Sequence, residues 1–166
     1  MSVDAIALDP AQFRELFRRH AAGVVVITLD SGDGPAGFTA TSFASVSLQP
    51  PLATFAISTT ASTWPQVRSA SSVVVNLLGA DAAELAARFA TSGIDRFAAP
   101  TRWRRLPTGE PVLDEAAHWL RGRLTELIPV GDHFLAVVAV DQISVGADVP
   151  ALAYHGGAYH PVGSRA

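Results

Sequence analysis

Cysteine is absent from the 166-residue chain, which excludes disulfide scaffolds, thiolate metal sites and thiol nucleophiles. Charge is also scarce, because Asp, Glu, Lys and Arg together make up 16% of the residues, whereas 49% are hydrophobic. Such a composition favours a folded domain over a disordered chain. The 12 Lys and Arg residues are fewer than the 15 Asp and Glu residues, so the sequence carries no electrostatic signature of nucleic-acid binding.

Long apolar runs are missing as well. No run approaches the roughly 20 residues that cross a bilayer, and the start Met1-Ser2-Val3-Asp4 has no basic segment followed by an apolar one. We therefore expect a cytoplasmic protein without a membrane partner, folded as one domain over residues 1–166 with a core at about 10–162. The high hydrophobic fraction also predicts that part of the apolar surface is buried between subunits.

Several motifs of catalysis are not found in the sequence. It contains no Gly-x-Gly-x-x-Gly dinucleotide fingerprint, no Gly-rich phosphate loop and no Gly-x-Ser-x-Gly nucleophile elbow. The histidines stand at positions 20, 118, 133, 155 and 160, without the close pairing of zinc-binding helices. In an extended segment His155 and His160 would face opposite sides. The sequence therefore predicts no metal site.

Local patterns predict a mainly β protein with few helices. Asp9-Pro10-Ala11-Gln12 has the pattern of a helix start, and we expect that helix to end at Gly23. Further helices are predicted at Trp64-Pro65 and over Asp81 to Ala90, and an irregular segment over 93–109. The predicted strands are 24–28, 36–48, 52–58, 73–78, 119–128, 134–145 and 151–154. Because strands and helices do not alternate, an antiparallel barrel with helical decoration is favoured over a parallel sheet.

One predicted strand has an unusual distribution of polar side chains. From Ala36 to Leu48 the even positions are mostly apolar, while the odd positions include a row of Ser and Thr, so one face would carry small hydroxyls. The loop from Ser58 to Thr63 adds more. Short donors of this kind suit a flat heteroaromatic ligand with a phosphate tail. Serine and threonine also populate ordinary strand faces and turns, so the pattern alone leaves both interpretations open.

The run from Gly37 to Leu52 resembles the signature of the flavin reductase-like family, the FMN-binding split barrels that serve two-component monooxygenases. Shorter matches follow in the family's order over about residues 10–162, namely Ala21–Val24, Ser62–Pro65, Val75–Leu78, Arg88–Ala90, Asp95–Phe97, Gly131–His133 and Tyr154–Gly156 with Tyr159. The resemblance implies an antiparallel Greek-key split β-barrel with an N-terminal helix and short peripheral helices.

The resemblance also implies an activity. It indicates a homodimeric, NAD(P)H-dependent flavin reductase that transfers hydride from NADH or NADPH to FMN or FAD and supplies reduced flavin to a separate monooxygenase. Two alternatives remain open: a split-barrel flavoprotein that acts on another substrate, and a flavin-binding carrier or sensor without turnover.

Site residues are carried over position by position. The resemblance implies flavin contacts at Thr39, Ala40, Thr41, Ser42, Phe43, Ser45, Val46, Ser58, Ser62, Thr63, Trp64, Arg88 and Phe89. It implies nicotinamide contacts at His133, Tyr154, His155, Gly156 and Tyr159, with His133 as the candidate catalytic residue.

This sequence departs from the family pattern at two places. Val138 stands where many relatives have glycine, and the segment between Ser58 and Trp64 contains neither Arg nor Lys. The second departure predicts that the flavin tail meets hydroxyl and amide donors only. Flavin affinity would then be modest, as suits a flavin that enters and leaves as a substrate.

Overall fold

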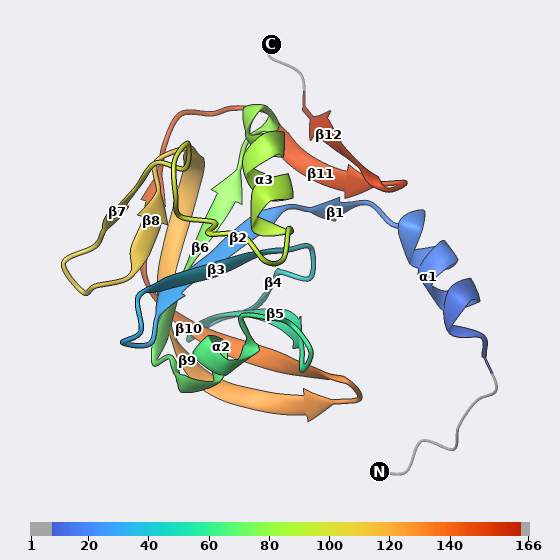
Figure 1. Ribbon diagram of the computed structural model, residues 1–166, viewed down its shortest axis with the longest axis horizontal. Coiled ribbons are helices and arrows are strands. Elements are labelled where there is room, and N and C mark those ends of the chain that lie inside the picture. Colours follow the sequence, from blue (N-terminus) through green and yellow to red (C-terminus); the bar gives the residue numbers. More distant parts are fainter. Residues whose placement is uncertain (1–7, 164–166) are drawn as a thin grey trace.

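The computed structural model of the protein describes residues 8–163, so the predicted features of Met1-Ser2-Val3-Asp4 lie outside the described part. Seven strands form one curved antiparallel sheet in the order β3-β2-β6-β9-β10-β5-β4 (Figure 1). These strands are β2 (Val25–Asp30), β3 (Pro35–Ala40), β4 (Ala44–Leu48), β5 (Pro51–Ser58), β6 (Ser72–Leu78), β9 (Ala116–Val130) and β10 (His133–Val145). The prediction of a mainly β, antiparallel fold is confirmed.

Smaller elements surround this sheet. A three-stranded sheet joins β1 (Ala22–Gly23), β11 (Ala151–His155) and β12 (Ala158–Val162), and a ribbon joins β7 (Trp103–Arg105) to β8 (Pro111–Leu113). The helices are α1 (Pro10–Arg18), α2 (Trp64–Ser69), the 3-10 turn η1 (Ala80–Ala82) and α3 (Ala83–Phe89). None of the helices in residues 8–163 has the length and apolar character of a membrane span.

The main sheet curves around an apolar core. Its interior strands β2 and β6 each contain at least three consecutive β-branched residues, which favour extended backbone and pack well on both faces. Val26, Ile27 and Val75 are fully buried. Across the core, the rings of Phe38 on β3 and Phe55 on β5 lie 5.9 Å apart between centroids. The edge strand β3 therefore approaches β5, although no ladder joins the two strands in the described chain. The barrel stays open at this place.

The predicted single strand over 36–48 is wrong, because the chain breaks it into β3 and β4. These two strands lie at opposite edges of the main sheet, so the intervening residues Thr41, Ser42 and Phe43 must cross the opening between the edges. The expected alternation of faces therefore does not continue into β4, where Val46 and Leu48 are 62% and 84% exposed.

Helix α1 is shorter than predicted, since it ends at Arg18 and Gly23 belongs to β1. The Arg18 guanidinium donates to the carbonyl of Gly156 at 3.2 Å, and the Arg18 carbonyl accepts from the Gly156 N–H at 2.8 Å. These bonds fasten the end of α1 to the turn between β11 and β12. Figure 1 shows the rest of α1 standing apart from the β-structure, and none of its residues is buried. The strands β1, β7, β8 and β12 were not predicted.

A buried asparagine joins three elements. The Asn76 amide of β6 donates to the Val26 carbonyl and to Thr28 Oγ1, each at 2.9 Å, and its Oδ1 accepts from the Leu113 N–H at 3.0 Å. Thr28 Oγ1 in turn donates to the Pro111 carbonyl at 2.6 Å. The polar interior position of the 73–78 strand thus anchors β8 to the main sheet.

A second buried polar group is Glu110, which is 3% exposed. Its carboxylate accepts from Arg121 Nε at 2.8 Å and from the hydroxyls of Ser72 and Thr108. Arg121 also pairs with Asp141 at 2.7 Å. Burial alone would raise the pKa of Glu110, but the bonds from Arg121, Ser72 and Thr108 outweigh it and lower the pKa to about 2.

Acid is expected to destabilise the protein through Glu110. Because its pKa falls from 4.5 in the unfolded chain to about 2 in the folded one, the stabilisation is complete above about pH 4.5 and is lost as the pH falls toward 2. The difference amounts to about 3 kcal/mol. Urea denaturation at a series of pH values should show a steeper acid loss of stability in the wild type than in Glu110→Gln. Equal slopes would contradict this account.

Candidate active site

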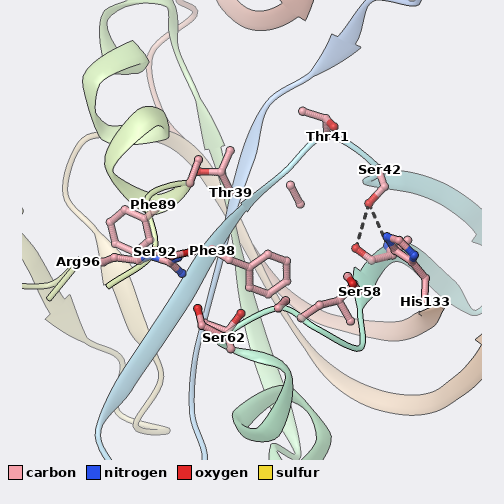
Figure 2. Close-up of a pocket in the computed structure, with 16 residues that line it drawn as sticks. Phe38, Thr39, Thr41, Ser42, Ser58, Ser62, Phe89, Ser92, Arg96 and His133 are labelled. Carbon is pink, nitrogen blue, oxygen red and sulfur yellow. Dashed lines mark hydrogen bonds between the residues drawn. The ribbon is translucent and has the colours of Figure 1, made fainter. Parts of the chain in front are cut away.

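A cavity of about 420 Å³ lies at the opening between β3 and β5 (Figure 2). Its walls come from β3 and the residues that follow it, from the end of β5 and the loop before α2, from the end of α3 and the loop after it, and from the first residue of β10. The lining residues are Phe38, Thr39, Ala40, Thr41, Ser42, Ala56, Ile57, Ser58, Ala61, Ser62, Thr63, Phe89, Ala90, Ser92, Arg96 and His133.

Two hydroxyls hold the β3 side of the cavity in place. Thr39 Oγ1 donates to the Ala86 carbonyl at 2.6 Å, which fixes α3 against β3. Ser42 Oγ accepts from the Ala56 N–H at 2.9 Å and donates to the Ala56 carbonyl at 3.3 Å, as the dashed lines in Figure 2 show. The crossing segment is therefore fastened to β5, on the far side of the opening.

His133 stands at the exposed mouth of the cavity. It pairs with Ser58 across the β5 and β10 ladder, and the Thr59 N–H donates to the Asp132 carbonyl at 3.1 Å. The imidazole Nδ1 lies 2.7 Å from Asp132 Oδ1, and this hydrogen bond lowers the pKa of Asp132. Because the side chain of His133 is 46% exposed, its ring is accessible to a ligand that enters the cavity.

Arg96 lies at the opposite end of the cavity from His133 (Figure 2). Its Nη1 donates to the Gly37 carbonyl at 2.6 Å and its Nε donates to the Thr91 carbonyl at 2.9 Å. Burial lowers the pKa of Arg96, but an arginine remains a cation at neutral pH. These two bonds hold the guanidinium at the end of the cavity that Ser62 also lines. Its positive charge favours the binding of an anion there.

The structure places a cation at this end of the cavity, where the sequence predicted hydroxyl and amide donors only. The sequence lacks a cation between Ser58 and Trp64, yet folding brings Arg96 beside that loop from the segment after α3. The signal for this residue in the sequence is the family match Asp95-Arg96-Phe97, in which Arg96 is the central position.

The sequence model of a protein family, the flavin reductase like domain, matches residues 17–163 of the chain. The chain belongs to the flavin reductase-like domain family. The resemblance predicted from the sequence is thereby confirmed.

Named relatives include flavin reductases and reductase subunits. The chain is 48% identical to an NADH:FMN oxidoreductase of Rhodococcus erythropolis over 152 residues, which cover 89% of this chain and 79% of the relative. It is 32% identical to the flavin-dependent monooxygenase reductase subunit HsaB of Rhodococcus jostii, over 93% of this chain and 80% of that protein.

Solved structures share the architecture. A flavin reductase domain protein from Arthrobacter sp. FB24 superposes with a TM-score of 0.88 at 39% identity, covering 95% of this chain and 98% of that one. BorF, the flavin reductase component of a bacterial two-component tryptophan halogenase, gives a TM-score of 0.86 at 31% identity, covering 95% and 100% of the two chains.

Most flavin contacts expected from the family signature line the cavity. These are Thr39, Ala40, Thr41, Ser42, Ser58, Ser62, Thr63 and Phe89. The cavity also has lining residues that sequence reasoning did not select: Phe38, Ala56, Ile57, Ala61, Ala90, Ser92 and Arg96. Five of these seven are apolar, and nothing in their local pattern separates them from ordinary core positions.

Five expected flavin contacts lie outside the cavity lining. Ser45 and Val46 follow the break at the crossing segment and stand exposed on the edge strand β4. Phe43 lines a neighbouring apolar cavity instead. Trp64 stacks on Phe134 with ring centroids 4.4 Å apart, so its ring is occupied in packing α2 against β10.

The fifth such residue, Arg88, points elsewhere for a geometric reason. Phe89 faces the core and the cavity from α3, and the preceding residue is rotated by about 100° around the helix axis. The Arg88 guanidinium donates to Thr101 Oγ1 at 3.1 Å, which binds α3 to the following loop.

The residues expected to contact nicotinamide are only partly brought together. Tyr154 lines a cavity of about 750 Å³ that shares Thr41 and Ser42 with the first cavity. Its ring packs against Tyr159 at 5.2 Å between centroids. His155, Gly156 and Tyr159 line neither cavity, because they lie at or beyond the turn between β11 and β12.

Proposed function

We propose that this protein is an NAD(P)H:flavin oxidoreductase that transfers hydride from NADH or NADPH to FMN or FAD and supplies reduced flavin to a separate flavin-dependent monooxygenase. The observation that carries the proposal is the cavity between β3 and β5, with a fixed cation at one end and an accessible imidazole at the other. Membership of the family and the named reductase relatives support it.

The donor set fits a flavin. The hydroxyls of Ser42 and Ser58 are already bonded within the chain, to Ala56 and Thr60. At the His133 end, where we place the polar edge of the isoalloxazine, Thr41 and backbone groups would therefore serve the ligand. Arg96 and Ser62 would hold the phosphate of the tail at the other end. Short uncharged donors allow the ring to approach the backbone closely, and Phe38 provides an apolar wall.

A bound flavin supplies the hydride acceptor, which is chemistry that no side chain of this protein can provide. The residues act by positioning, because two stacked rings held at contact distance react without a proton transfer from the protein. We assign His133 to the nicotinamide side of the site, since it stands at the open mouth. Thr39 and Ser42 keep the walls at a fixed separation through their bonds to Ala86 and Ala56.

A turnover assay tests the proposal against its alternatives. Purified protein is mixed with FMN or FAD and with NADH or NADPH, and the nicotinamide absorbance is followed. Consumption in large excess over enzyme that depends on added flavin is the expected result. A flavin that binds but is not reduced by either nucleotide would indicate a carrier or sensor, and binding without flavin-dependent turnover would indicate another substrate.

His133→Ala is expected to impair use of the nucleotide more than binding of the flavin. Loss of an exposed contact at the mouth should raise the KM for NADH by about 10-fold, equivalent to roughly 1.4 kcal/mol, while the flavin Kd changes by less than about twofold. Stopped-flow flavin reduction and flavin titration give the two values. His160→Ala, an exposed histidine outside the cavity lining, is the control. An unchanged rate and affinity would remove His133 from the site.

We also propose that the protein is a homodimer. Phe13, Leu16 and Phe17 follow helical spacing on α1 and are 53%, 65% and 52% exposed, so a second copy would bury an apolar helix face that the single chain leaves in water. Leu16→Glu is expected to convert dimers into monomers, as measured by light scattering after size-exclusion chromatography. A monomeric wild type, or a dimeric Leu16→Glu protein, would contradict the proposed interface.

A further inference from the structure

Arg96 stands between two hollow spaces. It lines the first cavity and also a second cavity of about 270 Å³, whose other walls include Pro35 and Gln66. A guanidinium with open space beside it on two sides has few packing contacts, so its position depends on directed hydrogen bonds. Two such bonds fix the head of the side chain, which donates to the carbonyls of Gly37 and Thr91.

The backbone that carries Arg96 is itself poorly supported. Residues 91–95 are exposed and irregular, and Gly93 has a positive φ of 77°. Exposed segments with few buried contacts have low local stability. One of the two carbonyls that hold the guanidinium, that of Thr91, belongs to this same loop. Its bond therefore cannot by itself keep Arg96 at the end of the cavity.

Thr101 supplies the missing anchor from the far end of the loop. It is 7% exposed, and its Oγ1 donates to the Arg96 carbonyl at 2.7 Å and accepts from Arg88 Nη1 at 3.1 Å. The direction of these bonds is fixed, because an arginine can only donate and leaves the threonine hydrogen for the carbonyl. The residue after Thr101 is held by the ribbon of β7 and β8, since the Arg102 carbonyl accepts from the Asp114 N–H at 3.0 Å. The hydroxyl thus ties the Arg96 backbone to that ribbon.

The other buried anchor of the loop is apolar. Phe97 packs edge-on against Phe89 and Trp103, with ring centroids 5.2 and 5.3 Å apart. Such packing holds the loop against the core, but apolar contacts are not directional. They leave the orientation of the preceding residue open, whereas the bond from Thr101 acts on the Arg96 carbonyl itself.

We infer that Thr101 is a positioning residue for flavin binding, because it holds Arg96 in place before the phosphate arrives. The inference rests on the proposed function, which assigns the flavin phosphate to Arg96. Thr101 lines neither the first nor the second cavity, so its effect on a ligand passes through Arg96. A charge that is already ordered binds its partner at a smaller entropic cost. Loss of the hydroxyl should therefore weaken the phosphate contact and leave the ring contacts intact.

Titration of Thr101→Val with FMN and with riboflavin tests the inference. The variant keeps the shape of the side chain and removes its hydroxyl, so we expect the Kd for FMN to rise about 3- to 10-fold. The Kd for riboflavin, which lacks the phosphate, should change by less than about twofold. In turnover assays the KM for FMN should rise, while kcat at saturating FMN stays within about twofold of the wild type.

Three further variants make the test specific. Thr101→Ser restores the hydroxyl and should recover most of the FMN affinity, whereas Thr101→Ala removes it with a smaller side chain and replaces the valine variant if that one does not fold. Thr54→Val is the matched control, because it removes a hydroxyl that donates to the Ala136 carbonyl at 2.8 Å outside the cavity lining. Its FMN affinity should equal that of the wild type. Circular dichroism checks the fold of each variant.

A double-mutant cycle separates positioning from a general structural role. In the Arg96→Ala background, Thr101→Val should change the Kd for FMN by less than about twofold, because the group that it positions is gone. Equal effects in the two backgrounds, or an equal loss of riboflavin and FMN affinity, would overturn the inference.

The remaining outcomes distinguish the inference from the proposed function. An FMN-specific loss in Arg96→Ala with no loss in either Thr101→Val or Thr101→Ala would overturn the role of Thr101 and leave the reductase proposal standing. If Arg96→Ala bound FMN as the wild type does, the assignment of the phosphate to Arg96 would be wrong, and the inference with it. Failure of both FMN and riboflavin to bind the wild type would overturn the proposed function itself.

Discussion

Replacement of Arg96 by alanine is expected to weaken FMN binding by about 10- to 100-fold. The guanidinium is held by the carbonyls of Gly37 and Thr91, so it offers its charge without a large entropic cost of ordering. Hydrogen bonds to a charged partner contribute about 1.5–3 kcal/mol, which corresponds to this range of affinity. Fluorescence titration of FMN measures the effect, and circular dichroism checks that the variant is folded.

Riboflavin makes this test specific, because it carries the same ring without the phosphate. Arg96→Ala should remove the preference for FMN over riboflavin while changing riboflavin affinity little. Arg88→Ala is the matched control, since that guanidinium binds Thr101 outside the cavity, and its affinity for FMN should stay within about twofold of the wild type. If Arg96→Ala weakened riboflavin and FMN equally, Arg96 would shape the cavity without binding the phosphate.

Asn76→Ala is expected to lower the free energy of unfolding by about 3–5 kcal/mol. The substitution leaves the Leu113 N–H buried without its partner and removes one bond each from Thr28 and from the Val26 carbonyl, which keeps its place in the β2 ladders. Each buried group that loses its partner costs about 1–3 kcal/mol. In a chain of this size the melting temperature should fall by about 10 °C or more.

Urea denaturation and thermal melting measure this loss. Gln142→Ala removes an exposed amide from β10 and should change stability by less than about 0.5 kcal/mol. A loss below about 1 kcal/mol in Asn76→Ala would mean that water or a shift of β8 replaces the bonds. The same variant should leave the flavin Kd almost unchanged if the protein is assayed well below its melting temperature, because Asn76 lies outside the cavity lining.

Local chemistry predicted much of the secondary structure correctly. The β-branched segments became β2 and β6, and the loop after Ser58 leads into the short helix α2 at Trp64. Capping residues, β-branched runs and prolines act over a few neighbours, so their effects can be deduced from a short stretch of sequence. The ordered matches from Ala21 to Tyr159 likewise indicated the family, which the comparison confirms.

Contacts between distant segments decided the rest. The alternating pattern over 36–48 continues through Thr41, yet the chain turns there because β3 and β4 occupy opposite edges of the sheet. The helix start at Asp9 was evident, but the end at Arg18 depends on bonds to Gly156, 138 residues away. A local pattern carries no information about such partners.

The sequence by itself therefore determined the mainly β class, the family and a set of hydroxyl residues beside a flavin-sized cavity. Only the tertiary structure placed Arg96 beside Ser62 and left Thr63 Oγ1 and Gln66 Oε1 unpaired at the wall of a second cavity. It also turned Trp64 and Arg88 away from the first cavity, because Trp64 stacks on Phe134 and Arg88 donates a hydrogen bond to Thr101. The physical reason is that side-chain type follows from the chain, whereas the direction in which a side chain points depends on which distant strand or helix packs against it.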